Sequence, residues 1–199
     1  MTITFPYASS SATARTYELE GVTITSGEVI ITSGIVSGTT LTTGSEPATT
    51  LKCTSYSVDY GKIAVDGGSL TINSQINIDT NGQTYTLFYI GASSSLTISC
   101  VSGKEMEISD STKTYNTGAI FHQADGTVNV TNIKITDCVP YVSETAEYVF
   151  RIDGTSSKST YSNITISNTN TELKGSVIGV QPSTDDAAEV VFDDVTIVV

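Results

Sequence analysis

The chain repeats a short alternating phrase, in which an aliphatic residue is followed by Thr, by Ile and by one further residue that is usually small and polar. The phrase occurs at residues 22–25, 70–73, 96–99, 164–167 and 195–198. Successive side chains of a strand point to opposite faces, so this alternation predicts strands with one buried and one solvent-facing side. Because the phrase recurs at intervals of tens of residues, we expect near-equivalent layers stacked as a solenoid.

From residue 62 onward the predicted layers can be aligned with one another. Each begins with an apolar strand that runs into a turn, at residues 63–67, 87–91, 119–121, 149–154 and 177–180, and continues into a strand with the Thr phrase. A third strand often follows, as at 105–108 and 133–136. The spacing is uneven: Leu70 to Leu96 is 26 residues, Leu96 to Val128 is 32 and Val128 to Ile164 is 36. This unevenness favours a parallel β-helix in which one corner accepts loops of variable length.

The fold class predicted from these layers is all-β, a single-stranded right-handed parallel β-helix. Short strands at 24–27, 31–34 and 41–44 around Gly turns predict one three-sided coil. We expect a single domain over 1–199, with residues 1–20 as a lead-in or cap and 21–199 as stacked coils. Loops rich in Ser, Thr, Asp or Gly are expected at 102–104, 109–117, 140–147, 155–159 and 181–187.

Composition narrows the class of protein. Of the 199 residues, 38% are hydrophobic and 15% charged, which excludes a charged disordered tail. No apolar run approaches the roughly 20 residues that span a bilayer, so we expect no membrane insertion. The formal charge of -12 repels phosphate backbones, so nucleic acid is not an expected partner. The acidity is interpreted as favouring solubility rather than a cation site.

Three cysteines, Cys53, Cys100 and Cys138, are too few for a disulfide framework and wrongly spaced for zinc. Cys100 and Cys138 each close a predicted strand, so they could lie above one another in adjacent layers. Buried free thiols are favoured over a disulfide between them, since Cys is often buried unpaired.

The segments 118–120, 127–130 and 132–138, with a weaker echo at 162–168, resemble the repeats of pectin-lyase-like right-handed β-helices. They are particularly similar to the GAI and Asn-containing repeats of polymorphic outer-membrane-type surface proteins. The resemblance covers roughly residues 62–199 and implies an extracellular or cell-surface setting. Polysaccharide enzymes, adhesins and phage spikes belong to this group.

The sequence does not assemble an active site, and we expect neither an enzyme nor a bound cofactor or metal. Arg151 and Asp153 alternate onto one face of a strand, where a surface ion pair is the simplest interpretation. His122 is the only histidine, and a structural role is favoured for it. The adjacent carboxylates 185–186 and 193–194 face opposite sides of their strands, so neither pair forms a catalytic dyad alone.

Two further sets of polar residues are candidate surface sites. Asn129 and Asn163 each begin a glycosylation sequon, which would be used only if a eukaryotic host secretes the chain. If the Ile residues of the repeated phrase point inward, two columns face outward and resemble the flat Thr faces of ice-binding solenoids. Their members are Thr23, Thr25, Thr71, Asn73, Thr97, Ser99, Thr165 and Ser167. The simpler interpretation is that β-branched Thr is the preferred polar residue of strands.

Three functions therefore follow as hypotheses. The preferred one is a non-catalytic structural or adhesive surface β-helix, because the last strand, 195–199, has no polar cap after it. Either the natural protein continues or something docks at this C-terminal coil: another copy, stacking end to end as a fibre, or another protein. The second is a carbohydrate-binding or polysaccharide-cleaving β-helix that uses Tyr85, Tyr89, Tyr115 or Tyr148 as sugar platforms. The third is an ice-binding Thr-ladder solenoid.

Overall fold

The computed structural model describes most of the chain and leaves out several connecting segments. The described residues are 1–6, 16–19, 21–37, 40–42, 49–53, 61–72, 76–82, 86–100, 105–112, 118–138, 148–154, 158–169, 176–181 and 188–198. They contain strands and turns but no helix. Accordingly, no helix in these ranges could cross a membrane.

One wall of the molecule is a six-stranded parallel sheet, called here the small sheet. Its strands, in chain order, are β3 (Val22–Ile24), β7 (Ile63–Val65), β10 (Phe88–Ile90), β13 (Phe121–Gln123), β15 (Tyr148–Ile152) and β17 (Ser176–Val180). Each strand pairs in parallel with the next one along the chain. Parallel neighbours separated by tens of residues require the chain to pass around a full coil between them.

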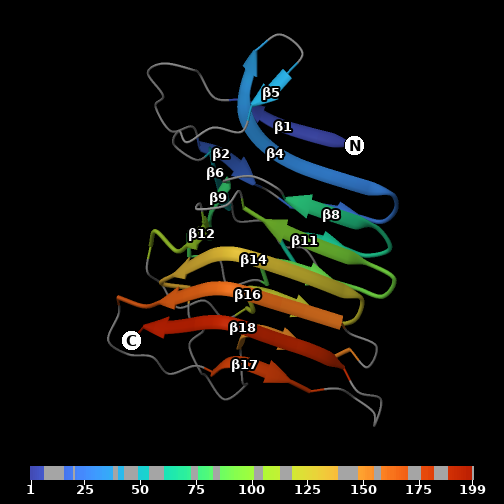
Figure 1. Ribbon diagram of the computed structural model, residues 1–199, viewed down its shortest axis with the longest axis vertical. Helices are drawn as coiled ribbons and strands as arrows, with labels where there is room; N and C mark the ends of the chain where they lie inside the picture. Colours follow the sequence, from blue (N-terminus) through green and yellow to red (C-terminus); the bar gives the residue numbers. More distant parts are fainter. Residues whose placement is uncertain are drawn as a thin grey trace.

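The other two walls are two arms of one larger sheet (Figure 1). The first arm holds β1 (Thr2–Pro6), β4 (Glu28–Ser37), β8 (Ser69–Ile72) and β11 (Ser95–Ser99), and the second holds β2 (Thr16–Leu19), β6 (Thr49–Cys53), β9 (Ile76–Asp79) and β12 (Met106–Ser109). Three ten-residue strands, β14 (Thr127–Thr136), β16 (Lys158–Ser167) and β18 (Glu189–Val198), belong to both arms. For example, β14 pairs with β11 through its first half and with β12 through its second.

The two arms meet at a corner made by left-handed residues. Asn132, Asn163 and Asp194 have φ values of 58°, 50° and 53° at equivalent places in β14, β16 and β18. Asn and Asp tolerate this region because their short polar side chains bond locally. The Asn163 amide nitrogen donates to the Asn132 side-chain oxygen at 2.6 Å, and the Asn132 amide donates to the Cys100 carbonyl at 3.3 Å. The amides therefore bond along the solenoid axis and fix the bend in successive coils.

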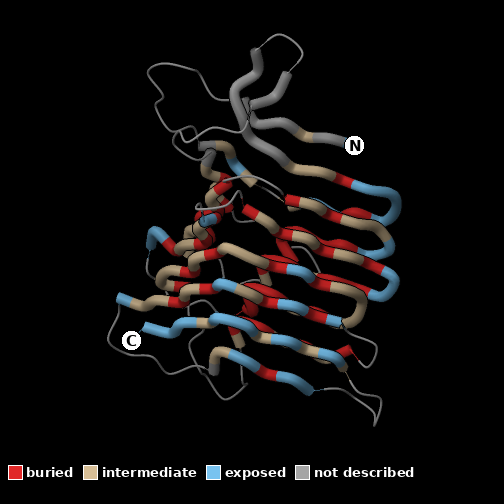
Figure 2. Tube along the Cα trace, in the orientation of Figure 1, coloured by how far each residue is buried: buried red, intermediate tan, exposed pale blue. Residues whose placement is uncertain are grey.

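The interior is filled by aliphatic and aromatic side chains stacked from coil to coil. Figure 2 shows buried positions recurring along the strands of successive coils. Along the small sheet, Phe88, Phe121 and Phe150 are fully buried, with ring centroids 5.2 and 5.5 Å apart and nearly parallel planes. Such aromatic pairs add about 0.5–1.5 kcal/mol each beyond the burial of their area. The register that stacks these rings also sets which outward side chains become neighbours.

The predicted parallel β-solenoid is thus confirmed, but its first coil differs from expectation. The segment 41–44 was expected to form a third wall, whereas β5 (Thr40–Thr42) folds back on β4 as an antiparallel partner. Gly-rich sequence permits such a hairpin as readily as a corner. The third wall is supplied later, by β6. Residues 1–20, expected as a lead-in or cap, contribute β1 and β2 to the stack itself.

Candidate functional site

The structure distributes the predicted Thr columns over all three walls. Thr71 and Thr97 are register partners on the first arm. Thr23 pairs with Ala64 on the small sheet, and Thr25 follows the same strand. Thr165 and Ser167 pair with the second half of β14 on the second arm, Ser99 lies on the first arm, and Asn73 lies outside the described residues. These residues therefore do not form two continuous columns.

A different hydroxyl-rich array is present on the outward face of the first arm. Its columns, read along the axis, are Ser69–Ser95–Thr127, Thr71–Thr97–Asn129–Thr160 and Ser99–Thr131–Ser162. Neighbouring strands of a sheet lie about 4.8 Å apart, so the array is regular. The aliphatic–Thr–Ile phrase could not predict this array, because strands of every wall alternate buried and outward residues and the phrase does not indicate to which wall a strand belongs. Ice binding stays a hypothesis, which unchanged ice-crystal growth in the presence of the protein would eliminate.

The outward face of the small sheet brings together residues that the sequence analysis considered separately. The register aligns Tyr89, His122 and Arg151 in one column. The Tyr89 and His122 rings meet edge to face with centroids 5.3 Å apart. Asp153 accepts a hydrogen bond from Arg151 Nε at 2.8 Å, and its same Oδ2 lies 3.0 Å from His122 Nε2. We call these four residues the small-sheet cluster; the expected Arg151–Asp153 ion pair is part of it.

Burial favours the neutral form of His122 within this cluster. Partial burial lowers the pKa of His122, and the nearby Arg151 cation lowers it further, while the hydrogen bond to the Asp153 carboxylate acts in the opposite direction. Desolvation outweighs the carboxylate because Asp153 already binds Arg151. A neutral imidazole beside an aromatic ring and an ion pair offers both a hydrogen-bonding edge and a stacking surface.

Of the four tyrosines predicted as sugar platforms, the structure describes two, Tyr89 and Tyr148. Tyr85 and Tyr115 lie outside the described residues. Tyr148 opens β15, and its hydroxyl accepts a hydrogen bond from Gln181 Nε2 at 3.1 Å. Its ring lies over Gly179, where a Cβ would come within 2.6 Å of ring atoms. Tyr148 therefore extends the aromatic surface of the small-sheet cluster toward the last coil.

The three cysteines are buried and free. Cys100 and Cys138 do not stack as expected: the corner residue Asn132 binds the Cys100 carbonyl, whereas Cys138 follows the second arm, with Sγ 3.3 Å from the Thr136 carbonyl oxygen. The physical reason is the corner at Asn132. Cys100 follows β11 on the first arm, whereas Cys138 follows the second half of β14, on the second arm. Burial raises the pKa of Cys53 to about 12, and it raises that of Cys138 as well. Both thiols are thus kept protonated and unreactive.

The two sequon asparagines have different surroundings. Asn129 is exposed in the middle of the first arm. Asn163 is also exposed, but it occupies the left-handed corner and its amide nitrogen bonds to Asn132. A glycan on Asn163 would replace that bond, so Asn129 is the more accessible acceptor.

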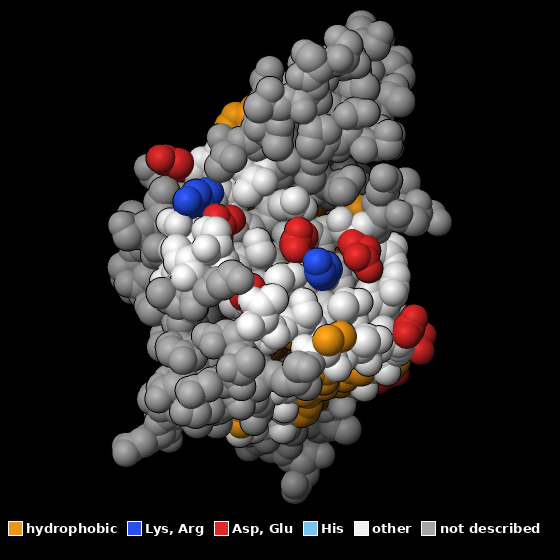
Figure 3. Space-filling model, turned by 90° about the vertical axis from the view of Figure 1, so that its left-hand side faces the viewer, with side chains coloured by type: hydrophobic (Ala, Val, Ile, Leu, Met, Phe, Trp, Pro, Cys, Tyr) orange, Lys and Arg blue, Asp and Glu red, His pale blue; other side chains and the backbone are white. Residues whose placement is uncertain are grey.

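The last coil leaves an apolar surface uncovered. Inward side chains at its end are exposed, namely Ile178 (39%), Val180 (44%) and Ile197 (46%). Figure 3 views the side of the molecule on which the second arm lies: charged side chains of both signs are scattered over this face, and hydrophobic ones gather at its lower end. The open end and the small-sheet cluster are the two candidate functional surfaces.

Comparison with protein-family models, with curated proteins and with solved structures finds no match for this chain. Nor do three or more His, Cys, Asp or Glu side chains gather, within the described ranges, closely enough to hold a metal ion.

Proposed function

We propose that the chain is a non-catalytic structural β-solenoid that assembles end to end, with its last coil covered by the first coil of a second copy. The proposal includes a cell-surface or extracellular setting, as the repeat resemblance implies, and an adhesive or scaffolding role. A rigid repeated framework whose two ends both present unpaired strand edges in the described residues supports it.

The observation that carries the proposal is the burial of equivalent positions in successive coils. Phe150 and Ile152 are fully buried, whereas their register partners in β17, Ile178 and Val180, are about two-fifths exposed. In the second arm Ile166 is 1% exposed and its partner Ile197 is 46% exposed. These side chains point inward and differ only in having no coil beyond them. Covering Ile197 with a second copy would recover the burial energy of about 25 cal/mol per Å² that earlier coils already have.

The strand edges at the two ends suit head-to-tail stacking. In the described part of the chain, β17 and β18 are the final strands at one end, and β1, β2 and β3 are the final strands at the other. All these strands run parallel within their walls, so β18 of one copy can continue onto β1 and β2 of the next. Such an interface joins two different surfaces and does not close on itself, so it generates a fibre.

Paired substitutions on the last coil test this assembly. Ile197→Lys places a charge at an inward end position, whereas Val191→Lys changes a residue of similar exposure that faces outward, in the column of Thr160. We expect the unmodified chain and Val191→Lys to associate with rising concentration in sedimentation velocity and to form filaments in electron microscopy. Ile197→Lys should remain monomeric.

A chain that stays strictly monomeric at high concentration would contradict the proposal. Equal association of the two lysine variants would also contradict it, because the contact would then lie elsewhere. Circular dichroism of both variants verifies that the solenoid is intact.

We further propose that the solenoid is of the pectin-lyase-like type, similar to outer-membrane-type surface repeats. The three walls and the Asn132–Asn163 corner support this finer assignment. Handedness measured in an experimental structure tests it: a left-handed coil would remove the assignment.

Carbohydrate binding is a second candidate, favoured by the small-sheet cluster. Tyr89 offers an aromatic face for a sugar ring, and the neutral His122 and the Arg151–Asp153 pair offer hydrogen-bonding groups beside it. Aromatic rings with neighbouring polar groups are typical of ligand surfaces. Polysaccharide cleavage is the enzymatic form of this alternative.

A glycan array compares the unmodified chain with Tyr89→Ala and with Thr97→Ala, which lies on the other sheet. Binding that Tyr89→Ala abolishes and Thr97→Ala preserves would support this candidate. A lyase assay with calcium tests cleavage. Absence of both glycan binding and cleavage would eliminate the candidate.

A further inference from the structure

The walls of the solenoid contain unequal numbers of levels. Counting strands along the described chain, the first arm has seven levels, from β1 to β18, and the second arm has seven, from β2 to β18. The small sheet has six, from β3 to β17. In chain order β1, β2 and β3 form the first coil and pair with β4, β6 and β7 of the second, so among the described residues the level without a small-sheet strand is the last one, that of β18. At the opposite end, no described strand pairs with the outer edges of β1, β2 and β3, so the first coil is open toward that end.

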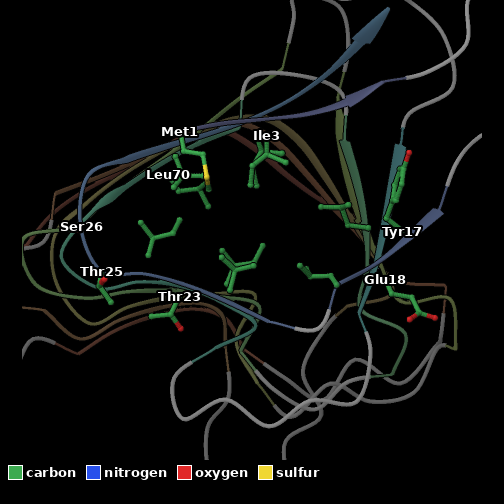
Figure 4. A pocket seen from close by; sticks show the side chains of 15 residues that line it. Met1, Ile3, Tyr17, Glu18, Thr23, Thr25, Ser26 and Leu70 are labelled. Atoms are coloured by element: carbon green, nitrogen blue, oxygen red, sulfur yellow. The ribbon is translucent and has the colours of Figure 1, made fainter. Parts of the chain in front are cut away.

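A hollow of about 300 Å³ occupies this position (Figure 4). Its lining is mostly aliphatic and includes residues from the first strand of each wall: Ile3 of β1, which Figure 4 shows pointing into the hollow, Leu19 of β2 and Val22 of β3. Val22 is 40% exposed, whereas Ile63, its register partner one level further along, is 2% exposed. The hollow is thus the space that a further strand of the small sheet would cover.

The backbone along this hollow is an open parallel edge. The Val22 N–H donates to the Lys62 carbonyl at 2.9 Å, and the Ile24 carbonyl accepts from the Asp66 N–H at 2.8 Å, so both residues bond toward β7. Alternate residues of a parallel strand bond to opposite sides. The N–H and C=O of Thr23 therefore point to the side away from β7, where an added parallel strand would meet them.

The size of the hollow matches what such a strand supplies. Strands of the small sheet insert two side chains into the interior, as Ile63 and Val65 or Phe88 and Ile90 do. A cavity of about 150 Å³ accommodates one benzene-sized group, so about 300 Å³ accommodates two aliphatic side chains. An isolated apolar molecule would fill the volume but leave the backbone groups of Thr23 unpaired.

The charges at the rim of the hollow favour basic residues at the two ends of an added strand. Glu18 lines the hollow and is exposed, and Glu28 is exposed just beyond β3. The Met1 ammonium, the positive group among the lining residues, already donates to the Glu28 carbonyl at 2.6 Å. A strand with basic residues at its ends would complement these carboxylates, whereas a second copy of this chain carries a net charge of -12.

We propose that an extended strand of a partner protein, with aliphatic residues at alternate positions and basic residues at its ends, adds in parallel to β3 and fills this hollow. Strand addition of this kind draws affinity from main-chain hydrogen bonds and specificity from alternate side-chain pockets. The proposal does not rest on end-to-end stacking. A stacked copy would pair β18 with β1 and β2, and the vacant position would remain between β17 and β3.

A fluorescent synthetic peptide tests the proposal on the full chain, kept dilute. The probe alternates Val and Thr and carries a pair of lysines at each end. We expect saturable binding by fluorescence anisotropy. Thr23→Pro removes the N–H that faces the peptide and should weaken binding about tenfold, because Pro is accepted on sheet edges but cannot donate. Thr23→Ala keeps that N–H and should bind like the unmodified chain.

Further probes make the test decisive. Val22→Asp changes an exposed lining residue and should weaken binding without unfolding the chain, so it serves if Thr23→Pro is unstable. A peptide with Ser in place of Val should not bind. Absence of saturable binding, or equal affinity for Thr23→Ala and Thr23→Pro, would overturn the proposal. So would loss of the bound peptide when the chain is concentrated enough to associate, since a second copy would then be the occupant.

Discussion

The Tyr161 side chain carries a hydroxyl group into a cluster of apolar Phe rings. It is fully buried, with ring centroids 4.7 Å from Phe150 and 5.0 Å from Phe192. Its hydroxyl oxygen is buried without a hydrogen-bond partner of good geometry, and the neighbouring Ser159 hydroxyl donates to the Gln123 side-chain oxygen. Burial raises the pKa of the phenol, so Tyr161 stays neutral. An unpaired buried hydroxyl is a cost that the aromatic packing offsets.

Tyr161→Phe should therefore leave the free energy of unfolding unchanged or raise it by about 1 kcal/mol, since it removes the unpaired group and keeps the ring. Phe150→Ala, its neighbour, should lower that free energy by about 3 kcal/mol or more, because it leaves a cavity. Urea unfolding followed by circular dichroism measures both. A clear loss of stability in Tyr161→Phe would show that the hydroxyl has a partner in solution.

His122 makes stability depend on pH. Its pKa in the folded chain lies below the ordinary 6.5, so the unfolded chain binds a proton first as pH falls. The free energy of unfolding should thus decrease from about pH 7.5 to about pH 5.5, where carboxylates with ordinary pKa values titrate little. His122→Gln should flatten this part of the profile in urea titrations. A profile that is identical for both chains would mean that burial does not control His122.

At the scale of elements, the alternation of apolar and polar residues was sufficient to predict most of the strands, their parallel stacking and the inward Ile positions. It could not assign a strand to a wall, because each wall buries alternate residues in the same way. The Thr phrases at 70–73 and 164–167 look equivalent but lie on different arms. The small-sheet cluster escaped prediction for the same reason: Tyr89, His122 and Arg151 are neighbours only through register. Asn at the corner was the available signal for the boundary between arms.

Asn132 tests how much the corner contributes. Asn132→Gly keeps the left-handed backbone accessible and loses the side-chain bonds, whereas Asn132→Ala also strains the backbone. We expect Ala to be less stable than Gly by about 1–2 kcal/mol, the usual cost of a left-handed non-Gly residue. Thermal or urea unfolding of the two variants measures the difference. Equal stability would mean that the bend relaxes when the amide is removed.

At the scale of the whole molecule, the apolar last coil and the strongly acidic surface have opposite effects on self-association. The apolar last coil favours association, whereas the net charge of -12 on every copy disfavours it. Long-range repulsion is screened by salt, with a Debye length of about 10 Å at 0.1 M and about 3 Å at 1 M. Apolar contacts between coils persist under the same conditions.

Raising the ionic strength should therefore increase the average mass measured by light scattering at constant protein concentration. Ile197→Lys serves as the control and should show little response, because its contact surface is lost. Association that weakens with salt would indicate that ion pairs, rather than the uncovered coil, hold the copies together.

Because the two ends of the solenoid are unlike, growth of a filament would have a direction. A chain that carries Ile197→Lys keeps β1, β2 and β3 intact, so it can still join the exposed last coil of a growing filament. Once joined, it offers no surface for the next copy. A small fraction of this variant mixed with unmodified chain should thus shorten filaments out of proportion to its amount, acting as a chain terminator at one tip only.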